Sequence, residues 1–134
     1  MDVVDLYTAE NYLNNKLNSG ENMKLRTEEH YGAVVIELKG NVMGGPEAQE
    51  FSDALHKLLD ENKKNVVIDL AETKFMNSSG LGMLISGYTT MKNGGGAMKL
   101  ANATDKIESL LVITKLITIF EHYTSVDEAL KSFK

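Results

Sequence analysis

The segment Asn65-Val-Val-Ile-Asp-Leu70 constrains the fold of this chain more than any other stretch. Its middle lacks polar alternation, which is typical of a strand buried on both faces between helices. A pattern typical of an amphipathic helix precedes it from about residue 46 to residue 62, and another follows after Asn77. The segment therefore predicts an α/β fold in which this strand lies at the centre of the sheet.

Short β-rich runs alternate with helical runs from Met23 to the end of the chain. Leu25 to Glu29 and Ala33 to Lys39 are predicted to pair as antiparallel strands, because His30-Tyr-Gly32 between them favours a tight turn. This hairpin opens the sheet.

The remaining segments complete the sheet and its helical cover. We expect residues 71–76 to form a loop and residues 97–101 and 117–120 to form two further strands. Thr104 with Asp105 is predicted to cap a third helix, and Ser125-Val-Asp-Glu128 is a capping box that opens a fourth. The expected product is a mixed, mostly parallel β-sheet of about four or five strands covered by about four helices.

The length of 134 residues suits one domain with one core, which we place at residues 23–134. Residues 1–22 differ in character, because they are rich in asparagine and carry three of the five net negative charges of the chain. We interpret them as a leader or N-terminal extension. Two interpretations stay open: a mobile leader, expression-derived or upstream of a natural start at Met23, or a docking helix from about Leu6 to Leu17.

Composition excludes several classes of function. The chain has no cysteine, which excludes disulfides, thiolate-bound metals and thiol nucleophiles, and its histidines are too dispersed to predict a metal site. No stripe of Lys and Arg with interleaved aromatics suggests nucleic-acid binding. No window approaches the roughly 18 apolar residues of a membrane span. We therefore expect a cytoplasmic protein without membrane insertion, nucleic-acid partner, metal or cofactor.

The segment Asn77-Ser-Ser-Gly-Leu-Gly82 carries more chemistry than folding requires. Ser78 is predicted to be the N-cap of the helix that follows, with Gly80 and Gly82 leaving its hydroxyl approachable by another protein. A phosphate there would add about −1.5 to −2 charges where the positive end of a helix dipole stabilises them. Plain helix capping is the alternative interpretation, and a phosphate-cradling nucleotide loop is disfavoured because no Gly-Lys-Ser/Thr is present.

Asp69-Leu70 followed by Phe75-Met-Asn-Ser-Ser-Gly-Leu-Gly82 resembles the signature of STAS domains, especially bacterial anti-sigma factor antagonists. The likeness covers Met23 to the C-terminus and includes Gly40, which would end the second strand, and the stretch from Gly95 to Leu100. The resemblance implies a non-enzymatic partner switch: the unphosphorylated antagonist binds an anti-sigma factor of the histidine-kinase-like ATPase type, which phosphorylates and releases it, and a separate serine phosphatase resets the switch.

By motif position, the resemblance implies that Ser78 accepts the phosphate and that Ser79, Gly80 and Leu81 share the contact surface. Asn77 and Met43 stand where the family often has acids, so the potential around Ser78 is less negative than in the familiar pattern. The stretch from Met43 and Gly44 to Pro46 is either a plain loop or a partner-contact loop near Ser78.

Two other functions remain open at this stage. One is a STAS subunit that is not switched by phosphate and serves a membrane-associated transporter or a larger signalling assembly. The other is a small enzyme with Ser78 as nucleophile and a histidine as base, although the Gly-x-Ser-x-Gly elbow is missing. The cognate kinase, the downstream process and the oligomeric state are left open by the sequence.

Overall fold

A computed structural model describes residues 23–133, so the predicted leader at residues 1–22 lies outside the described part of the chain. The elements in chain order are β1 (Lys24–His30), β2 (Ala33–Val42), α2 (Pro46–Asp60), β3 (Asn65–Asp69), β4 (Thr73–Met76), α3 (Ser78–Asn93), β5 (Ala97–Ala101), α4 (Asp105–Ile113), the 3-10 helix η1 (Leu116–Thr118), β6 (His122–Tyr123) and α5 (Val126–Lys131).

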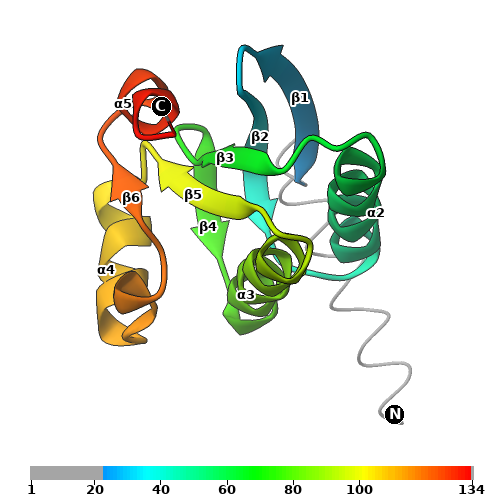
Figure 1. The fold of residues 1–134 in the computed structure, drawn as a ribbon. Helices are drawn as coiled ribbons and strands as arrows, with labels where there is room; N and C mark the ends of the chain where they lie inside the picture. Colours follow the sequence, from blue (N-terminus) through cyan, green and yellow to red (C-terminus); the bar gives the residue numbers. More distant parts are fainter. Residues whose placement is uncertain (1–22, 134) are drawn as a thin grey trace, which may run out of the picture.

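The six strands described in residues 23–133 form one mixed sheet (Figure 1). Five of them are neighbours in the order β1-β2-β3-β5-β6, and β4 pairs with β2 outside this order. Only the β1–β2 pair is antiparallel, and the other pairs are parallel. The prediction of a mostly parallel sheet is confirmed, with six strands in place of four or five. Because parallel strands end at one edge of the sheet, the starts of α2, α3, α4 and α5 follow that edge.

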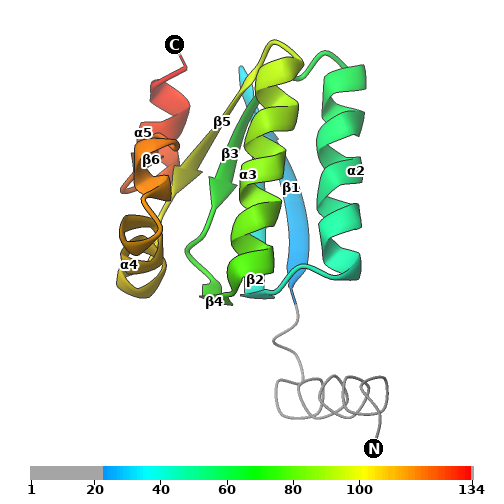
Figure 2. The ribbon, with the colours of Figure 1, turned by 90° about the horizontal axis from the view of Figure 1, so that it is seen from below.

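The central strand β3 is buried as its sequence predicts, with Val66, Val67 and Ile68 fully inaccessible to solvent. One face of the sheet carries the main core, and α2 and α3 lie side by side over it (Figure 2). On the other face, α5 packs on a smaller cluster that contains Val35, Val67, Ala101 and Ala129. The sheet is therefore covered by helices on both faces, which explains the absence of polar alternation in β3.

The prediction of a loop at residues 71–76 is wrong, because the last four of these residues form the strand β4. The Thr73 hydroxyl donates a hydrogen bond of 2.7 Å to the Leu38 carbonyl, and the Gly40 N–H donates one of 2.9 Å to the Glu72 carbonyl. Gly40 does not end β2: with a φ of +97° it allows a shift of register, after which β2 continues to Val42 beside β4. These hydrogen bonds join residues more than 30 positions apart in the sequence, so the sequence of β4 alone could not predict the strand.

The predicted edge strand at residues 117–120 is also wrong. Lys115 adopts a left-handed φ of +63°, and the chain then forms the 3-10 helix η1. Phe120 is buried and packs edge-to-face on Tyr88 with a centroid separation of 5.5 Å. Only the residues after Phe120 reach the free edge of β5, where His122 pairs with Leu100 as the start of β6.

Candidate partner-binding site

The N-cap of α3 is Asn77 and not Ser78, which corrects the sequence-based prediction. The Asn77 side-chain oxygen accepts a hydrogen bond of 2.8 Å from the Gly80 N–H. The backbone N–H of Asn77 donates a hydrogen bond of 3.3 Å to the Val42 carbonyl. This second bond extends the pairing of β4 with β2 by one residue and leaves Asn77 extended, with a φ of −99°. Asn and Ser cap helices about equally well, so the strand register decides which of them takes the position.

Ser78 is consequently the first helical residue of α3, and it is exposed together with Ser79. Neither hydroxyl forms a hydrogen bond with another residue in the described part of the chain. The N–H groups of these two residues begin the helix and lie outside its hydrogen-bond ladder. The Ser78 hydroxyl is therefore free to accept a modification at the positive end of a helix dipole.

The first turn of α3 differs electrostatically from the first turns of the other α-helices among residues 23–133. It contains no acidic residue, whereas α2, α4 and α5 each carry at least one carboxylate in the first turn. Those carboxylates compensate the positive end of their own helices. At α3 this compensation is missing, so a negative group added at Ser78 would meet no like charge within the turn.

The two glycines of the motif have different roles. Gly80 is buried against β2, and a Cβ added to it would lie 1.9 Å from the Val42 carbonyl oxygen. Gly80 therefore lets α3 approach the sheet, and it does not open the surface around Ser78 as the sequence suggests. Gly82 is exposed, and a Cβ there would meet nothing within 4 Å. Only Gly82 keeps the surface beside Ser78 low and open.

The loop after β2 packs on the first turn of α3, as the family resemblance implies. Gly44 has a φ of +81°, and a Cβ on it would lie 2.8 Å from the Ser79 Cβ. The neighbouring Met43 side chain is 40% exposed. Gly44 itself is buried against Ser79, so of the two predicted loop residues only Met43 shares the exposed surface with Ser78 and Ser79. By contrast, Leu81 is buried in the main core and offers little surface to a partner.

Phe75 is a surface residue that the sequence interpretation missed. It lies in β4 opposite Asn41, is 37% exposed, and has the Lys106 ammonium 5.0 Å from its ring centroid. Met43 and Phe75 each adjoin the paired ends of β2 and β4, at Val42 and Met76. The sequence does contain a signal for Phe75, because an aromatic residue three positions before the candidate modification site Ser78 can contribute to a partner surface. The predicted loop at residues 71–76 gave no reason to expect this side chain to be held at a fixed position by a strand.

Comparison with known proteins identifies the family of this fold and site. The family model described as STAS domain matches residues 24–129, which is most of the chain. The chain belongs to the STAS domain family. The match begins at Lys24 and ends at Ala129.

Relatives of this STAS domain are named as anti-sigma factor antagonists. The anti-sigma F factor antagonist of Paenibacillus polymyxa is 26% identical over 114 residues, 81% of this chain and 93% of the relative. The crystal structure of an anti-sigma factor antagonist from Mycobacterium paratuberculosis aligns with a TM-score of 0.73 at 22% identity, over 87% of this chain and 97% of the other. The phosphorylated form of the Bacillus cell fate determinant SpoIIAA aligns with a TM-score of 0.64 at 17% identity, over 83% and 100%.

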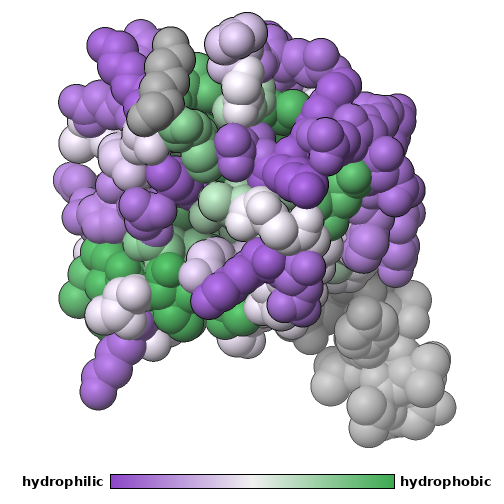
Figure 3. All heavy atoms as spheres, in the orientation of Figure 1, coloured by the Kyte–Doolittle hydropathy of each residue, from purple (hydrophilic) through white to green (hydrophobic). Residues whose placement is uncertain are grey.

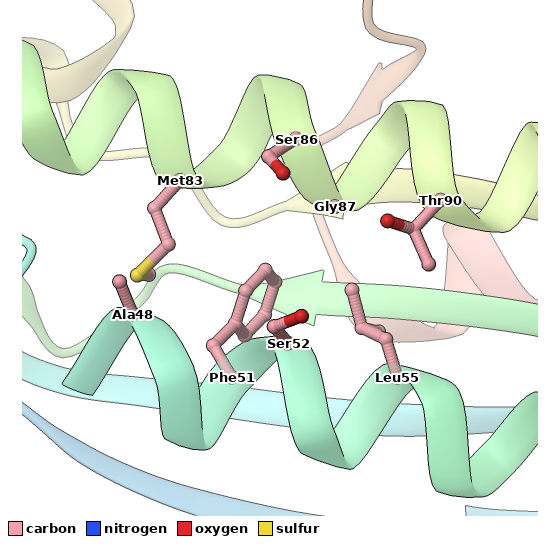
Figure 4. A pocket seen from close by; sticks show the side chains of 8 residues that line it. All are labelled: Ala48, Phe51, Ser52, Leu55, Met83, Ser86, Gly87 and Thr90. Carbon is pink, nitrogen blue, oxygen red and sulfur yellow. The ribbon is translucent and has the colours of Figure 1, made fainter. Parts of the chain in front are cut away.

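A small cleft of about 70 Å³ separates α2 from α3 in the STAS domain (Figure 4). Gly87 lets the helices approach closely here, since a Cβ on it would lie 2.7 Å from the Phe51 ring. This volume suits water molecules and not a cofactor. The lining residues are Ala48, Phe51, Ser52, Leu55, Met83, Ser86, Gly87 and Thr90.

Two further findings concern metals and membranes. Within residues 23–133, no group of three or more His, Asp or Glu side chains is placed to hold a metal ion. None of the described helices combines the length and apolar character needed to cross a bilayer.

Proposed function

We propose that this STAS domain is an anti-sigma factor antagonist that works by partner switching without catalysing a reaction. In this proposal, the surface formed by Met43, Asn77, Ser78 and Ser79, with the buried Gly44 packed beneath it, binds an anti-sigma factor of the histidine-kinase-like ATPase type. That partner phosphorylates Ser78 and then dissociates, and a serine phosphatase restores the binding form. The relatives named as antagonists support the choice of partner.

The observation that carries the proposal is the position of Ser78. Its exposed hydroxyl stands at the first residue of α3, in a turn without acids and without a hydrogen bond to any residue within 23–133. Phosphorylation therefore breaks no contact that holds the fold. The phosphate gains instead from the helix dipole and from the two N–H groups that begin the helix. The fold is expected to persist while its surface changes.

The loss of binding follows from the surroundings of Ser78. Exposed Met43 adjoins Gly44, which packs on Ser79, and exposed Gly82 lies one helical turn after Ser78, so neither adds charge to a surface that suits close packing by another protein. A dianion on this surface would have to be desolvated or paired with a cation when the partner docks. Since one unpaired charge at an interface costs several kcal/mol, roughly a hundredfold or greater loss of affinity is expected.

Asn77 supports a neutral environment for the phosphate. Its amide caps α3 through Gly80 and so takes over the structural task of the position without adding a charge. Met43 likewise adds no charge. The two replacements of family acids are therefore compatible with phosphorylation, and they alter what a kinase finds around its substrate hydroxyl.

The histidines support a binding function over serine catalysis. The His30 ring lies 3.2 Å from the Glu28 carboxylate, and the His56 ring lies 2.9 Å from the Ser52 carbonyl oxygen. Among the described residues, no histidine ring forms a hydrogen bond with Ser78, as a general base for a serine nucleophile would. Stoichiometric labelling of Ser78 by an activity-based serine probe would contradict the proposal.

The test is affinity capture from the native lysate with wild-type, Ser78→Asp and Thr89→Asp chains as baits. Thr89 is exposed on the same helix, so its variant adds an equal charge away from the site. We expect the wild type and Thr89→Asp to retain an ATPase-type anti-sigma factor and Ser78→Asp to lose it. Intact-mass measurement after incubation with that partner and ATP should show one phosphate, absent in Ser78→Ala.

If Ser78 stays unmodified with the captured kinase and Ser78→Asp retains every partner, the switch does not operate here. A partner that is a transporter or a larger signalling assembly would then favour a STAS subunit that is not controlled by phosphate.

A further inference from the structure

The outward side of α4 exposes aliphatic side chains that the core does not explain. Val112 is 53% exposed and Ile113 is 76% exposed, while Ile107 and Leu111 on the inward side of α4 are buried. Ile119, just after the adjoining η1, is 41% exposed. Figure 3 shows a hydrophobic area at the lower left, over the position of α4 and η1. Contiguous apolar surface of this kind commonly marks a contact site.

The charges along this side of α4 follow a simple order. Asp105, Glu108, Ser109, Val112 and Ile113 line one open hollow, which we call the α4 face. Its acids lie in the first turn of the helix and its aliphatic residues in the last turn. Lys115 lies just beyond the C-cap residue Thr114 and is exposed. The α4 face therefore runs from negative through apolar to positive.

The order of charges along the α4 face distinguishes three partners that could bind it: residues 1–22, a membrane surface and a second copy of the chain. Residues 1–22 carry four acids against one lysine, so their charge does not match the acidic start of the face. A helix that lies on an anionic membrane surface surrounds its apolar side with Lys and Arg, and here acids take that place. A second copy of the same face turned end for end, by contrast, complements it at both ends.

We propose that the α4 face pairs with the α4 face of a second copy of this chain in an antiparallel, two-fold symmetric contact. Centring the contact near Val112 places Glu108 of each copy beside Lys115 of the other, because both lie at similar separations from that residue in the sequence. Within residues 23–133, neither Glu108 nor Lys115 forms an ion pair inside its own chain. The symmetry makes each interaction occur twice.

The strength of this association follows from the small size of the face. Stable dimers bury at least about 1,000 Å² of surface, and a contact made by Val112 and Ile113 of each copy with two ion pairs falls toward the weak end of this range. We therefore expect a dissociation constant between about 100 μM and about 1 mM. The contact does not use Ser78 and does not depend on the proposed function, so either can fail without the other.

The test measures the association of the full chain by sedimentation equilibrium from about 10 μM to about 1 mM. Ile113→Asp should weaken dimerisation by at least about tenfold, since it buries an unpaired charge in the contact. Because Ile113 is largely exposed in the single chain, this variant should fold normally, which circular dichroism can check.

A charge exchange tests the orientation. Glu108→Lys and Lys115→Glu should each weaken dimerisation by about tenfold, and the chain with both changes should dimerise within about threefold of the wild type. Glu50→Lys, at an exposed position of α2, is the matched control and should have no effect.

Four results would overturn the inference. The first is a monomer at every concentration tested, and the second is a dimer that Ile113→Asp leaves unchanged. The third is a failure of the double charge exchange to restore association, which would assign the contact to another face or another orientation. Capture of a different protein on the α4 face of a monomeric chain would likewise replace the second copy as its partner.

Discussion

Gly80 touches the backbone of Val42 so closely that no side chain fits between α3 and the sheet. A Cβ on Gly80 would lie 1.9 Å from the Val42 carbonyl oxygen and 2.8 Å from its carbonyl carbon. The same carbonyl accepts the hydrogen bond of the Asn77 N–H. The position of Ser78 on the surface therefore depends on a glycine two residues later in the chain.

We predict that Gly80→Ala lowers the free energy of unfolding by about 3 kcal/mol or more, because backbone atoms cannot move aside as a flexible side chain would. Urea unfolding followed by circular dichroism measures this. Gly82→Ala is the matched control: its Cβ meets nothing, and it should raise stability by about 0.5–1 kcal/mol through the lower entropy of the unfolded chain. Equal effects of the two variants would contradict the contact.

The identity of the α3 cap is tested by two alanine variants. Asn77→Ala should cost about 1 kcal/mol of unfolding free energy, because the Gly80 N–H loses its acceptor. Ser78→Ala should stay within about 0.5 kcal/mol of the wild type, because its hydroxyl makes no contact within the described residues. A larger loss of unfolding free energy in Ser78→Ala than in Asn77→Ala would show that Ser78 is the cap.

Lys99 fastens α5 to its face of the sheet. Its ammonium lies 2.8 Å from the Ser132 hydroxyl and 4.2 Å from the centroid of the Phe133 ring. Lys99→Ala should lower the free energy of unfolding by about 1–3 kcal/mol, through the lost hydrogen bond and the lost packing of a buried side chain. Hydrogen exchange should accelerate in α5 more than in α2. Lys131→Ala, exposed on α5, should change neither measurement.

Lys63 links the first hairpin to the loop after α2 in a pH-dependent way. Its pKa is raised above 10.5 by hydrogen bonds to the carboxylates of Glu29 and then Glu61. A raised folded-state pKa means that the stabilisation is present below the unfolded value and disappears as pH rises through the folded value. The stability difference between wild type and Lys63→Gln should therefore persist at pH 8 and vanish above the raised pKa. If the stability difference stays constant at alkaline pH, it does not come from the charge of Lys63.

Met43 allows the proposed binding surface to be tested without a charge. Met43→Ser should reduce retention of the captured anti-sigma factor by about tenfold, because it removes an exposed apolar contact beside Ser79. Since Met43 lies outside the core, the free energy of unfolding should change by less than about 0.5 kcal/mol. Surface plasmon resonance with Ile113→Ser as control distinguishes this surface from the α4 face. Equal losses for both variants would show that neither position is specific.

Elements whose pattern is local agree with the sequence prediction. The hairpin turns where His30-Tyr-Gly32 favours it, β3 lies at the sheet centre, and the Ser125 hydroxyl accepts the Glu128 N–H at 3.1 Å as a capping box predicts. In each case the residues that interact are near neighbours or share one strong burial pattern. The interaction can therefore be inferred from the order of the residues alone.

Elements that depend on distant partners were predicted wrongly or missed. The strand β4 exists because Thr73 and Gly40 bridge two segments more than 30 residues apart. The run from Ile117 to Phe120 has strand-like composition, yet the packing of Phe120 on Tyr88 draws it away from the sheet edge. Tertiary contacts override local preference at both places.

The order of residues by itself determined that this chain builds a mostly parallel sheet with a serine-rich turn before a helix, because hydrophobic period and capping chemistry are local properties. Only the tertiary structure decided that Asn77 and not Ser78 caps this helix, and that Met43 and Phe75 flank its start. The physical reason is register: the hydrogen bond from Asn77 to Val42 and the close fit of Gly80 fix which residue begins the helix. Those contacts join residues that lie far apart in the chain.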